Sequence, residues 1–289
     1  MAFLRARSSG GQLVLRIEDL DPPRVVPGSA EAMCADLRWL GLDWDEGPDG
    51  GPHGPYSQSQ RVDRYSAALA HLAHRGLVYP CTCTRREIAT IASAPHGAAD
   101  LGPRYPGTCR SSPAAPGRAA TTRFRMPEPP PGFFDAIHGE VDPSEWGGDF
   151  VVQRADGLWS YQLAVVVDDA DMGITEVVRG DDLLPSTPRQ IALYRAFDLP
   201  VPCFMHVPLV LGADSQRLSK RHASVAISEL RRGGMSPAEL VGRIATSLGL
   251  AAEGERISAA ELIGRFDPEL IPREPFRWSA PSPETAPRS

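Results

Sequence analysis

The sequence predicts an α/β fold with an open parallel sheet and a ligand site at the carboxyl edge of that sheet. Two segments carry this prediction, because in each a short apolar run ends in polar residues and a helix start follows. Residues 13–17 lead into 18–21, which hold three carboxylates, and residues 175–179 lead into 180–182, which hold two. Polar side chains at the carboxyl ends of parallel strands line the ligand crevice of open α/β sheets.

The composition is that of an ordinary globular protein, and the cysteine content bears on the cellular compartment that we expect. It has 289 residues, of which 42% are hydrophobic and 23% charged, and no apolar run approaches the ~20 residues of a membrane span. The five cysteines are an odd number, which does not suggest a disulfide framework; we expect a cytoplasmic protein and interpret Cys34 and Cys203 as small buried side chains. The net charge of −6 argues against a general nucleic-acid coat but leaves room for a local basic face for one RNA.

Helical patterns precede and follow the first of these strands. Residues 3–7 resemble the last turn of a helix. The segment 29–40 is a predicted helix with Ser29 as N-cap and Met33, Leu37 and Leu40 on one face, and a second helix is predicted over 61–75. Each of these two ends just before a glycine, which is typical of a helix stop.

The remaining elements are assigned from periodicity and turn residues. Residues 149–154 form a predicted strand, 163–167 fit either a strand or a helix, and 206–212 form a predicted buried strand. A helix is expected to open at 186–190, where a capping residue precedes proline. Two capping boxes, at 236–239 and 258–261, predict short helices, and residues 279–289 are expected to be a disordered tail.

Three cysteines fall close together in a segment rich in alanine, glycine and proline. They are Cys81, Cys83 and Cys109, and thiolates are soft ligands suited to zinc. A structural zinc needs four donors, so the fourth is Tyr105, His96 or a water molecule. We therefore predict a structural zinc site here, with three small buried thiols as the alternative.

Lys220 is the only lysine of the chain, and the other 29 basic residues are arginines. A compact ammonium on a flexible stem suits a phosphate group that moves during a reaction, and a planar guanidinium does not replace it there. Taken alone, the segment 216–222 fits a solvated basic loop equally well. In the same way Arg179 is well placed to meet a carboxylate, while structural pairing is the alternative for both Arg179 and Tyr161.

Together these motifs resemble the glutamyl branch of the class I aminoacyl-tRNA synthetases, over about residues 3–228. The matching motifs are Arg16-Ile17-Glu18-Asp19-Leu20-Asp21, Tyr161 with Asp168-Asp169, Arg179-Gly180-Asp181-Asp182, Thr187-Pro188-Arg189-Gln190 and Arg217-Leu218-Ser219-Lys220-Arg221. The last corresponds to the family's KMSKS loop. The resemblance implies a Rossmann-type parallel sheet over 1–77 and 149–228, a zinc-binding insertion over 78–148, and a short helical region over 229–278.

The resemblance also implies roles for particular residues. Glu18, Tyr161 and Arg179 would bind glutamate. The ATP phosphates would be held by the loop residues Arg217, Ser219 and Lys220, with Mg²⁺ assisting and Lys220 gripping the departing pyrophosphate. The family's Cys-x-Cys and Tyr-x-x-x-Cys pattern favours Tyr105 over His96 as the fourth zinc ligand.

Within this branch the chain is most similar to a short paralogue without an anticodon-binding domain. That paralogue passes activated glutamate to the queuosine base in the anticodon of tRNA(Asp), so we expect the same partners, and a monomer. The family's first strand and its HIGH-type motif would precede residue 3 and are not in this sequence, so we expect the chain as given to have little glutamate-activating activity. A fragment of a glutamyl-tRNA synthetase and a non-catalytic remnant of the fold are the alternatives.

Overall fold

The structure is a computed structural model that describes residues 1–84, 86–88, 104–111, 115–212, 214–215 and 227–278. His96 and the segment 216–222 lie outside these ranges. None of the helices within them is long and apolar enough to cross a membrane. The helices are α1 (Ala2–Ser8), α2 (Ser29–Trp39), α3 (Val62–His74), α5 (Tyr161–Asp171), α6 (Thr187–Ala196), α7 (Ile227–Arg232), α8 (Pro237–Ser247) and α9 (Ala259–Ile263).

Three sheets are present in the described ranges. The strands are β1 (Val78–Cys81), β2 (Thr121–Phe124), β3 (Phe133–Asp135), β4 (Gly139–Val141), β5 (Phe150–Gln153), β6 (Glu176–Gly180), β7 (Cys203–Val207), β8 (Val210–Leu211) and β9 (Phe276–Arg277). They are ordered β1-β2-β5, β4-β3-β7-β6 and β8-β9.

The four-stranded sheet is mixed rather than wholly parallel as predicted. β7 lies between β3 and β6 and runs parallel to both, which requires long crossovers, and α6 connects β6 to β7. β4 is antiparallel because a tight hairpin joins it to β3, pairing Asp135 with Gly139 at a φ of 76°. Both β3 and β4 come from the range 78–148, so part of that range is built into the same sheet as β6 and β7.

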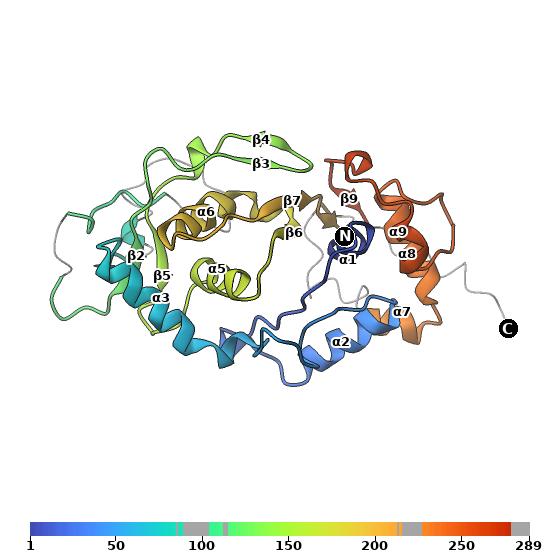
Figure 1. Cartoon of the computed structure of the whole chain (residues 1–289), viewed down its shortest axis with the longest axis horizontal. Coiled ribbons are helices and arrows are strands. Elements are labelled where there is room, and N and C mark those ends of the chain that lie inside the picture. The colour runs from blue at the N-terminus through green and yellow to red at the C-terminus, as the bar shows by residue number, and fades with distance from the viewer. Residues whose placement is uncertain (85, 89–103, 112–114, 213, 216–226, 279–289) are drawn as a thin grey trace.

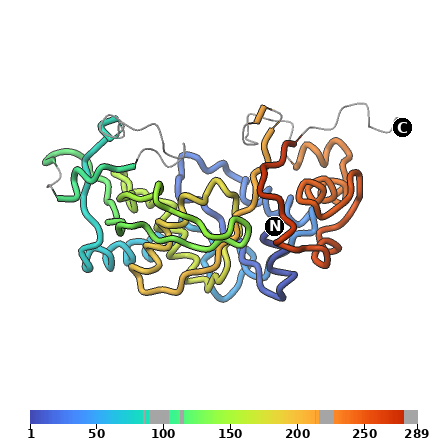
Figure 2. The backbone as a smooth tube through the Cα atoms, turned by 90° about the horizontal axis from the view of Figure 1, so that it is seen from above, coloured from blue at the N-terminus to red at the C-terminus, as the bar shows by residue number. Residues whose placement is uncertain are grey.

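Two apolar cores flank this sheet. One joins α3, β2, β5, α5 and α6 through buried residues that include Leu72, Phe150, Leu163 and Leu193. The other joins α1 to α8 and α9, and its buried residues include Phe3, Leu4 and Leu262. Figure 1 shows α1 lying against α8 and α9 at one end of the molecule, and Figure 2 shows the same proximity of the N-terminus to residues 237–263.

The prediction that residues 13–17 form a buried strand of the sheet is wrong. This segment is half-buried and makes only two isolated bridges, Val14 with Glu46 and Ile17 with Ser57. Its backbone bonds go to loop residues, as in the 2.8 Å bond from the Leu15 N–H to the Glu46 carbonyl. Within the described ranges no strand ladder forms along it, because its partners are loops rather than a neighbouring strand.

Other elements also differ in detail from their predictions. The run 206–212 is divided between β7 and β8 in two sheets, because Pro208 has no N–H to continue a ladder. Helix α2 begins at Ser29 itself, with Gly28 as its N-cap. Met33 is 65% exposed, because the buried face of that helix holds Cys34 instead.

The predictions for the longer helices and the second capping box are confirmed. Residues 163–167 lie in α5, so the ambiguous segment is helical. Ser258 and Glu261 form a reciprocal capping box, whereas at Ser236 the structure shows the side-chain cap on the Glu239 N–H.

Candidate functional site

A cavity of about 660 Å³ lies between residues 11–18, helix α5 and strand β6. Its lining includes Glu18, Tyr161 and Arg179, the three residues predicted to bind glutamate, together with Arg16 and Asp169. The volume falls within the range of small-molecule sites. The structure thus brings together, from three separate segments, the side chains that the sequence singled out.

Local folding explains how these side chains reach the cavity. Tyr161 is the first residue of α5, whose start is fixed by Ser160 as N-cap, with its side chain accepting a bond from the Leu163 N–H. Arg179 lies near the carboxyl end of β6. Glu18 follows the extended segment 13–17, so all three come from the ends of backbone elements that meet at this cavity.

Arg179 is held from behind by three side chains that do not line the cavity. Its Nε donates to His206 Nε2 at 3.0 Å, its Nη1 to Gln190 Oε1 at 2.7 Å, and its Nη2 to Thr187 Oγ1 at 2.8 Å. A fourth, longer bond of 3.4 Å runs from Nη1 to the Tyr161 hydroxyl. In the described part of the chain every hydrogen-bond partner of this guanidinium is a group other than a carboxylate.

Arg16, in contrast to Arg179, is surrounded by carboxylates. Its Nη1 donates to Asp169 Oδ1 at 2.6 Å and its Nη2 to Glu18 Oε1 at 3.0 Å, and Asp168 Oδ2 lies 3.7 Å from its Nε. The Glu18 side chain is 43% exposed, so its carboxylate is anchored at one oxygen and open to the cavity. This end of the cavity therefore carries excess negative charge, and the Arg179 end carries positive charge.

Asp168 ties the cavity wall to the helix behind it. Its side chain is 0% exposed and accepts bonds from Arg61 Nε at 2.5 Å, Gln58 Nε2 at 2.7 Å and the Tyr65 hydroxyl at 2.9 Å. A buried carboxylate is tolerated only when it is paired and hydrogen-bonded in this way. The network fixes α5, and with it Tyr161, against α3 and the turn at 58–60.

Burial shifts the protonation equilibria of the groups around the cavity. It raises the pKa of Asp169, with the charge of Arg16 opposing that rise. It also raises the pKa of Tyr161, which Arg179 partly offsets, so the phenol stays neutral and can donate a hydrogen bond. The pKa of Arg16 is raised, because the attraction of Asp169 and Glu18 outweighs its burial.

The predicted cysteine cluster is also assembled. The sulfur atoms of Cys81, Cys83 and Cys109 all lie within 4.8 Å of one another, and the Tyr105 hydroxyl is 3.3 Å from Cys81 Sγ and 3.6 Å from Cys83 Sγ. Burial alone would raise the pKa of Cys109, but the Tyr105 hydroxyl and a backbone N–H lower it to about 7. The three clustered thiols match the thiolate donors of a structural zinc, and the Tyr105 hydroxyl lies beside two of them.

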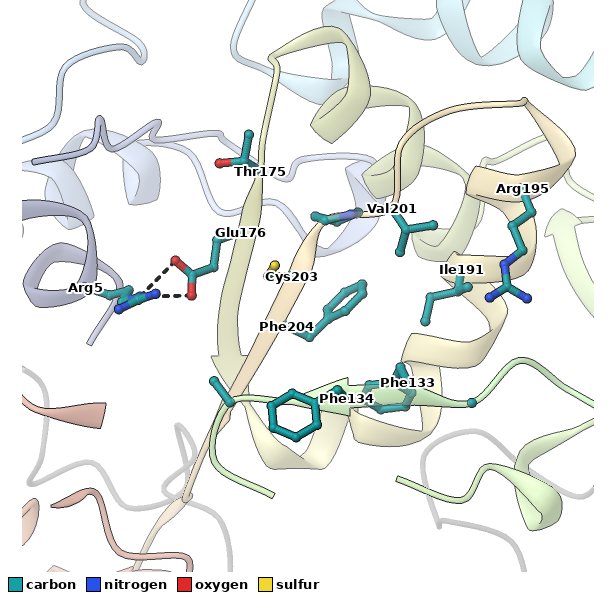
Figure 3. A pocket seen from close by; sticks show the side chains of 13 residues that line it. Arg5, Phe133, Phe134, Thr175, Glu176, Ile191, Arg195, Val201, Cys203 and Phe204 are labelled. Carbon is teal, nitrogen blue, oxygen red and sulfur yellow. Dashed lines mark hydrogen bonds and ion pairs between the residues drawn. The ribbon is translucent and has the colours of Figure 1, made fainter. Parts of the chain in front are cut away.

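A second cavity, of about 630 Å³, lies on the other side of β6 (Figure 3). Its lining is mainly apolar and aromatic and includes Phe133 and Phe204. The Arg5–Glu176 ion pair, with Nε 2.9 Å from each carboxylate oxygen, lines both cavities. Only the first cavity contains the opposed charges described above.

The predictions for the two other cysteines and for the loop residues have separate outcomes. Cys34 is buried as predicted, but Cys203 is exposed, because it is the first residue of β7 and opens onto the second cavity. Arg217, Ser219 and Lys220 lie outside the described residues, as does His96. Sequence reasoning did not single out Asp135 or His206 as site residues, since neither stands in a motif that indicates a site.

Comparisons with known proteins identify the family of the chain. Residues 1–274 match the family model described as tRNA synthetases class I (E and Q), catalytic domain. The chain is 54% identical to the glutamyl-Q tRNA(Asp) synthetase of Symbiobacterium thermophilum, an alignment that covers 97% of this chain and 90% of that protein. It is 47% identical to the protein of the same name from Nitratidesulfovibrio vulgaris, covering 96% and 88%.

Longer proteins match over part of their length. The chain is 41% identical to a glutamate–tRNA ligase of Anaeromyxobacter over 92% of this chain and 57% of that protein. Among solved structures it resembles a glutamate tRNA ligase from Elizabethkingia meningosepticum crystallised with its amino acid, with 28% identity, a TM-score of 0.78, and coverage of 96% of this chain and 62% of the other. The chain therefore spans about three fifths of these ligases. By its family match and these relatives, the chain belongs to the class I tRNA synthetases of the E and Q type, a family of ligases.

Proposed function

We propose that the protein activates glutamate with ATP and transfers it to the queuosine base in the anticodon of tRNA(Asp). The observation that carries this proposal is the arrangement of Arg179 and Glu18 across one cavity. A half-buried guanidinium without a carboxylate partner among the described residues is suited to accept an anionic ligand. Glu18, open to the same cavity, is suited to accept an ammonium.

A glutamate molecule carries the matching groups. Its ammonium would meet Glu18, and the carboxylate that does not react would meet Arg179, which leaves the other carboxylate free to attack the α-phosphate of ATP. As pyrophosphate leaves, negative charge spreads over phosphate oxygens, so positioned cations rather than a covalent protein nucleophile assist the step. By the resemblance of its loop, Lys220 would hold these phosphates with Arg217, Ser219 and Mg²⁺.

Zinc is proposed as a structural ion outside this chemistry. Cys81, Cys83, Cys109 and Tyr105 would hold it, since the four donor atoms already face one another. Its contribution would be to order the segment around β1, which is rich in glycine and proline.

The names of the two most similar relatives described above support queuosine-bearing tRNA(Asp) as the acceptor. The test supplies radiolabelled glutamate and ATP to the gene product, with any residues encoded upstream of Met1 included. We expect label in tRNA(Asp) that carries queuosine and none in the same tRNA without it. Label at the 3′ end of tRNA(Glu) would instead support a glutamate–tRNA ligase, and the absence of label in every tRNA would support a non-catalytic remnant.

A further inference from the structure

Behind Arg179 lies a buried pair of titratable side chains, Asp135 on β3 and His206 on β7. Both side chains are 0% exposed. Asp135 Oδ2 lies 2.7 Å from His206 Nδ1 and also accepts the His206 backbone N–H at 3.0 Å. The other oxygen, Oδ1, accepts the backbone N–H groups of Ile137 and His138, each at 3.0 Å. The carboxylate is therefore fixed by four bonds and cannot rotate away from the imidazole.

These contacts define the tautomer of His206. An ionised carboxylate only accepts hydrogen bonds, so the proton must be on Nδ1. On the other side of the ring Nε2 faces Arg179 Nε at 3.0 Å, and a guanidinium only donates, so Nε2 must be an unprotonated acceptor. The imidazole is thus neutral, in agreement with its buried position, which lowers the pKa of His206 although Asp135 opposes that change.

The tautomer of His206 helps to fix the orientation of the Arg179 guanidinium, because His206 Nε2 accepts the Arg179 Nε–H. With Nε–H held by His206, and one N–H on each terminal nitrogen held by Gln190 and Thr187, the guanidinium plane is fixed from behind. Two donors remain for a ligand: the second N–H of Nη2, and the second N–H of Nη1, which makes only the long 3.4 Å bond to the Tyr161 hydroxyl. Arg179 lines the cavity, whereas His206, Gln190 and Thr187 do not. If His206 carried its proton on Nε2 instead, two N–H donors would face each other and the guanidinium would have to turn.

We propose that Asp135 and His206 are positioning residues that set the Arg179 guanidinium and make the cavity select a carboxylate over a carboxamide. The proposal rests on the proposed function, in which Arg179 receives the unreactive carboxylate of glutamate. A fixed fork of donors accepts two carboxylate oxygens, whereas a carboxamide turns an N–H₂ donor toward one arm of the fork. Orientation of Arg179 therefore contributes to discrimination between glutamate and glutamine.

The first test needs no ligand. Nitrogen NMR of the imidazole side chains near neutral pH reports which ring nitrogen is protonated, and the His206 signals are assigned among the 7 histidines by their loss in His206→Gln. We expect a protonated Nδ1 and an unprotonated Nε2. A protonated Nε2, in either the other tautomer or the imidazolium, would overturn the proposal.

The second test changes the tautomer with an isosteric substitution. In Asp135→Asn the side-chain N–H₂ faces His206 Nδ1, which forces the proton onto Nε2, toward Arg179. We expect glutamate affinity measured by calorimetry to fall about tenfold or more, and the ratio of glutamate to glutamine affinity to fall with it. Met205→Leu, at a fully buried neighbouring position that makes no polar side-chain contact with Arg179, controls for a general loss of stability in β7.

A pair of substitutions at the histidine separates positioning from packing. His206→Gln keeps an amide oxygen able to accept the Arg179 Nε–H, whereas His206→Leu fills the space without an acceptor. We expect the glutamate preference to be largely retained in the first and lost in the second, and thermal melting of both variants shows how much of the loss comes from the stability of the buried Asp135. An unchanged preference in both Asp135→Asn and His206→Leu would overturn the inference.

One outcome separates this inference from the function on which it rests. If the wild-type gene product, with any residues encoded upstream of Met1 included, binds no glutamate, the proposed function fails. The positioning claim is then decided by the NMR signal of the Arg179 Nε–H. A signal protected in wild type and lost in Asp135→Asn would support it, and an equal signal in both would contradict it.

Discussion

The cavity lined by Glu18 and Arg179 and the cysteine cluster are built in opposite ways. The cluster takes all its donors from one stretch of chain, Cys81 to Cys109. The cavity joins groups far apart in sequence, as in the Arg16–Asp169 bond across 153 positions. The difference teaches that the donors of the cluster are brought together within one segment, whereas the cavity depends on the packing of α3, α5 and β6.

The largest effect is expected at the cluster. Replacing Cys83 by serine removes one of three thiolates, so we expect zinc to fall from about one per chain to near zero, because a structural site needs its full donor set. Elemental analysis of the purified protein measures this. Cys203→Ser is the matched control, since Cys203 is exposed and outside the cluster. Full zinc content in Cys83→Ser would show that the cluster is not a metal site.

The next effect is on the stability of the cavity wall. In Asp168→Asn the fully buried Arg61 loses its charged partner at 2.5 Å, a loss that costs several kcal/mol. We expect the free energy of unfolding to fall by about 3 kcal/mol, the lower end of the usual range, because Asp171 still faces Arg61 at 2.9 Å. Urea denaturation followed by circular dichroism provides the measurement.

A surface pair of the same chemistry is the control for that prediction. Arg75 and Asp198 are joined at 2.7 Å, but the Asp198 side chain is 75% exposed. We expect Asp198→Asn to cost less than about 1 kcal/mol. Equal losses in the two variants would contradict the view that the buried network, rather than ion pairing in general, supports the cavity.

The smallest effect is expected at Tyr161. Its bond to Arg179 is long, at 3.4 Å, and Tyr161→Phe keeps the ring that packs on the cavity wall. We expect glutamate affinity to fall by between about threefold and tenfold, which corresponds to one modest neutral hydrogen bond. Calorimetry with glutamate tests this. A loss as large as that of removing the Arg179 charge would mean that the phenol, not the guanidinium, dominates recognition.

Much of the site was predictable because its residues carry functional chemistry at the ends of elements. Glu18 and Arg179 follow apolar runs, so polar residues there indicated a crevice, and the structure places both on one cavity. The cysteine cluster was predictable because three soft ligands fall within one short segment of the sequence. The longer helices followed from their periodicity, as at the buried Tyr65 and Leu72 of α3.

What sequence reasoning missed depends on contacts across the sheet. The pairing of Asp135 with His206 arises because β3 and β7 are parallel neighbours, and nothing in either local sequence indicates that. The 13–17 segment has a strand-like composition, but its partners are loops, which periodicity does not report. Cys203 is exposed because it begins its strand rather than lying inside it.

The central claim, that Arg179 receives a carboxylate of glutamate, is tested most directly by calorimetry on wild type and Arg179→Gln. The substitution keeps a polar side chain and removes the charge, so we expect glutamate affinity to fall about 100-fold and the preference over glutamine to disappear. Arg195→Gln is the matched control, since Arg195 is exposed and lines only the second of the two cavities described above. Equal glutamate affinity in wild type and Arg179→Gln would contradict the account.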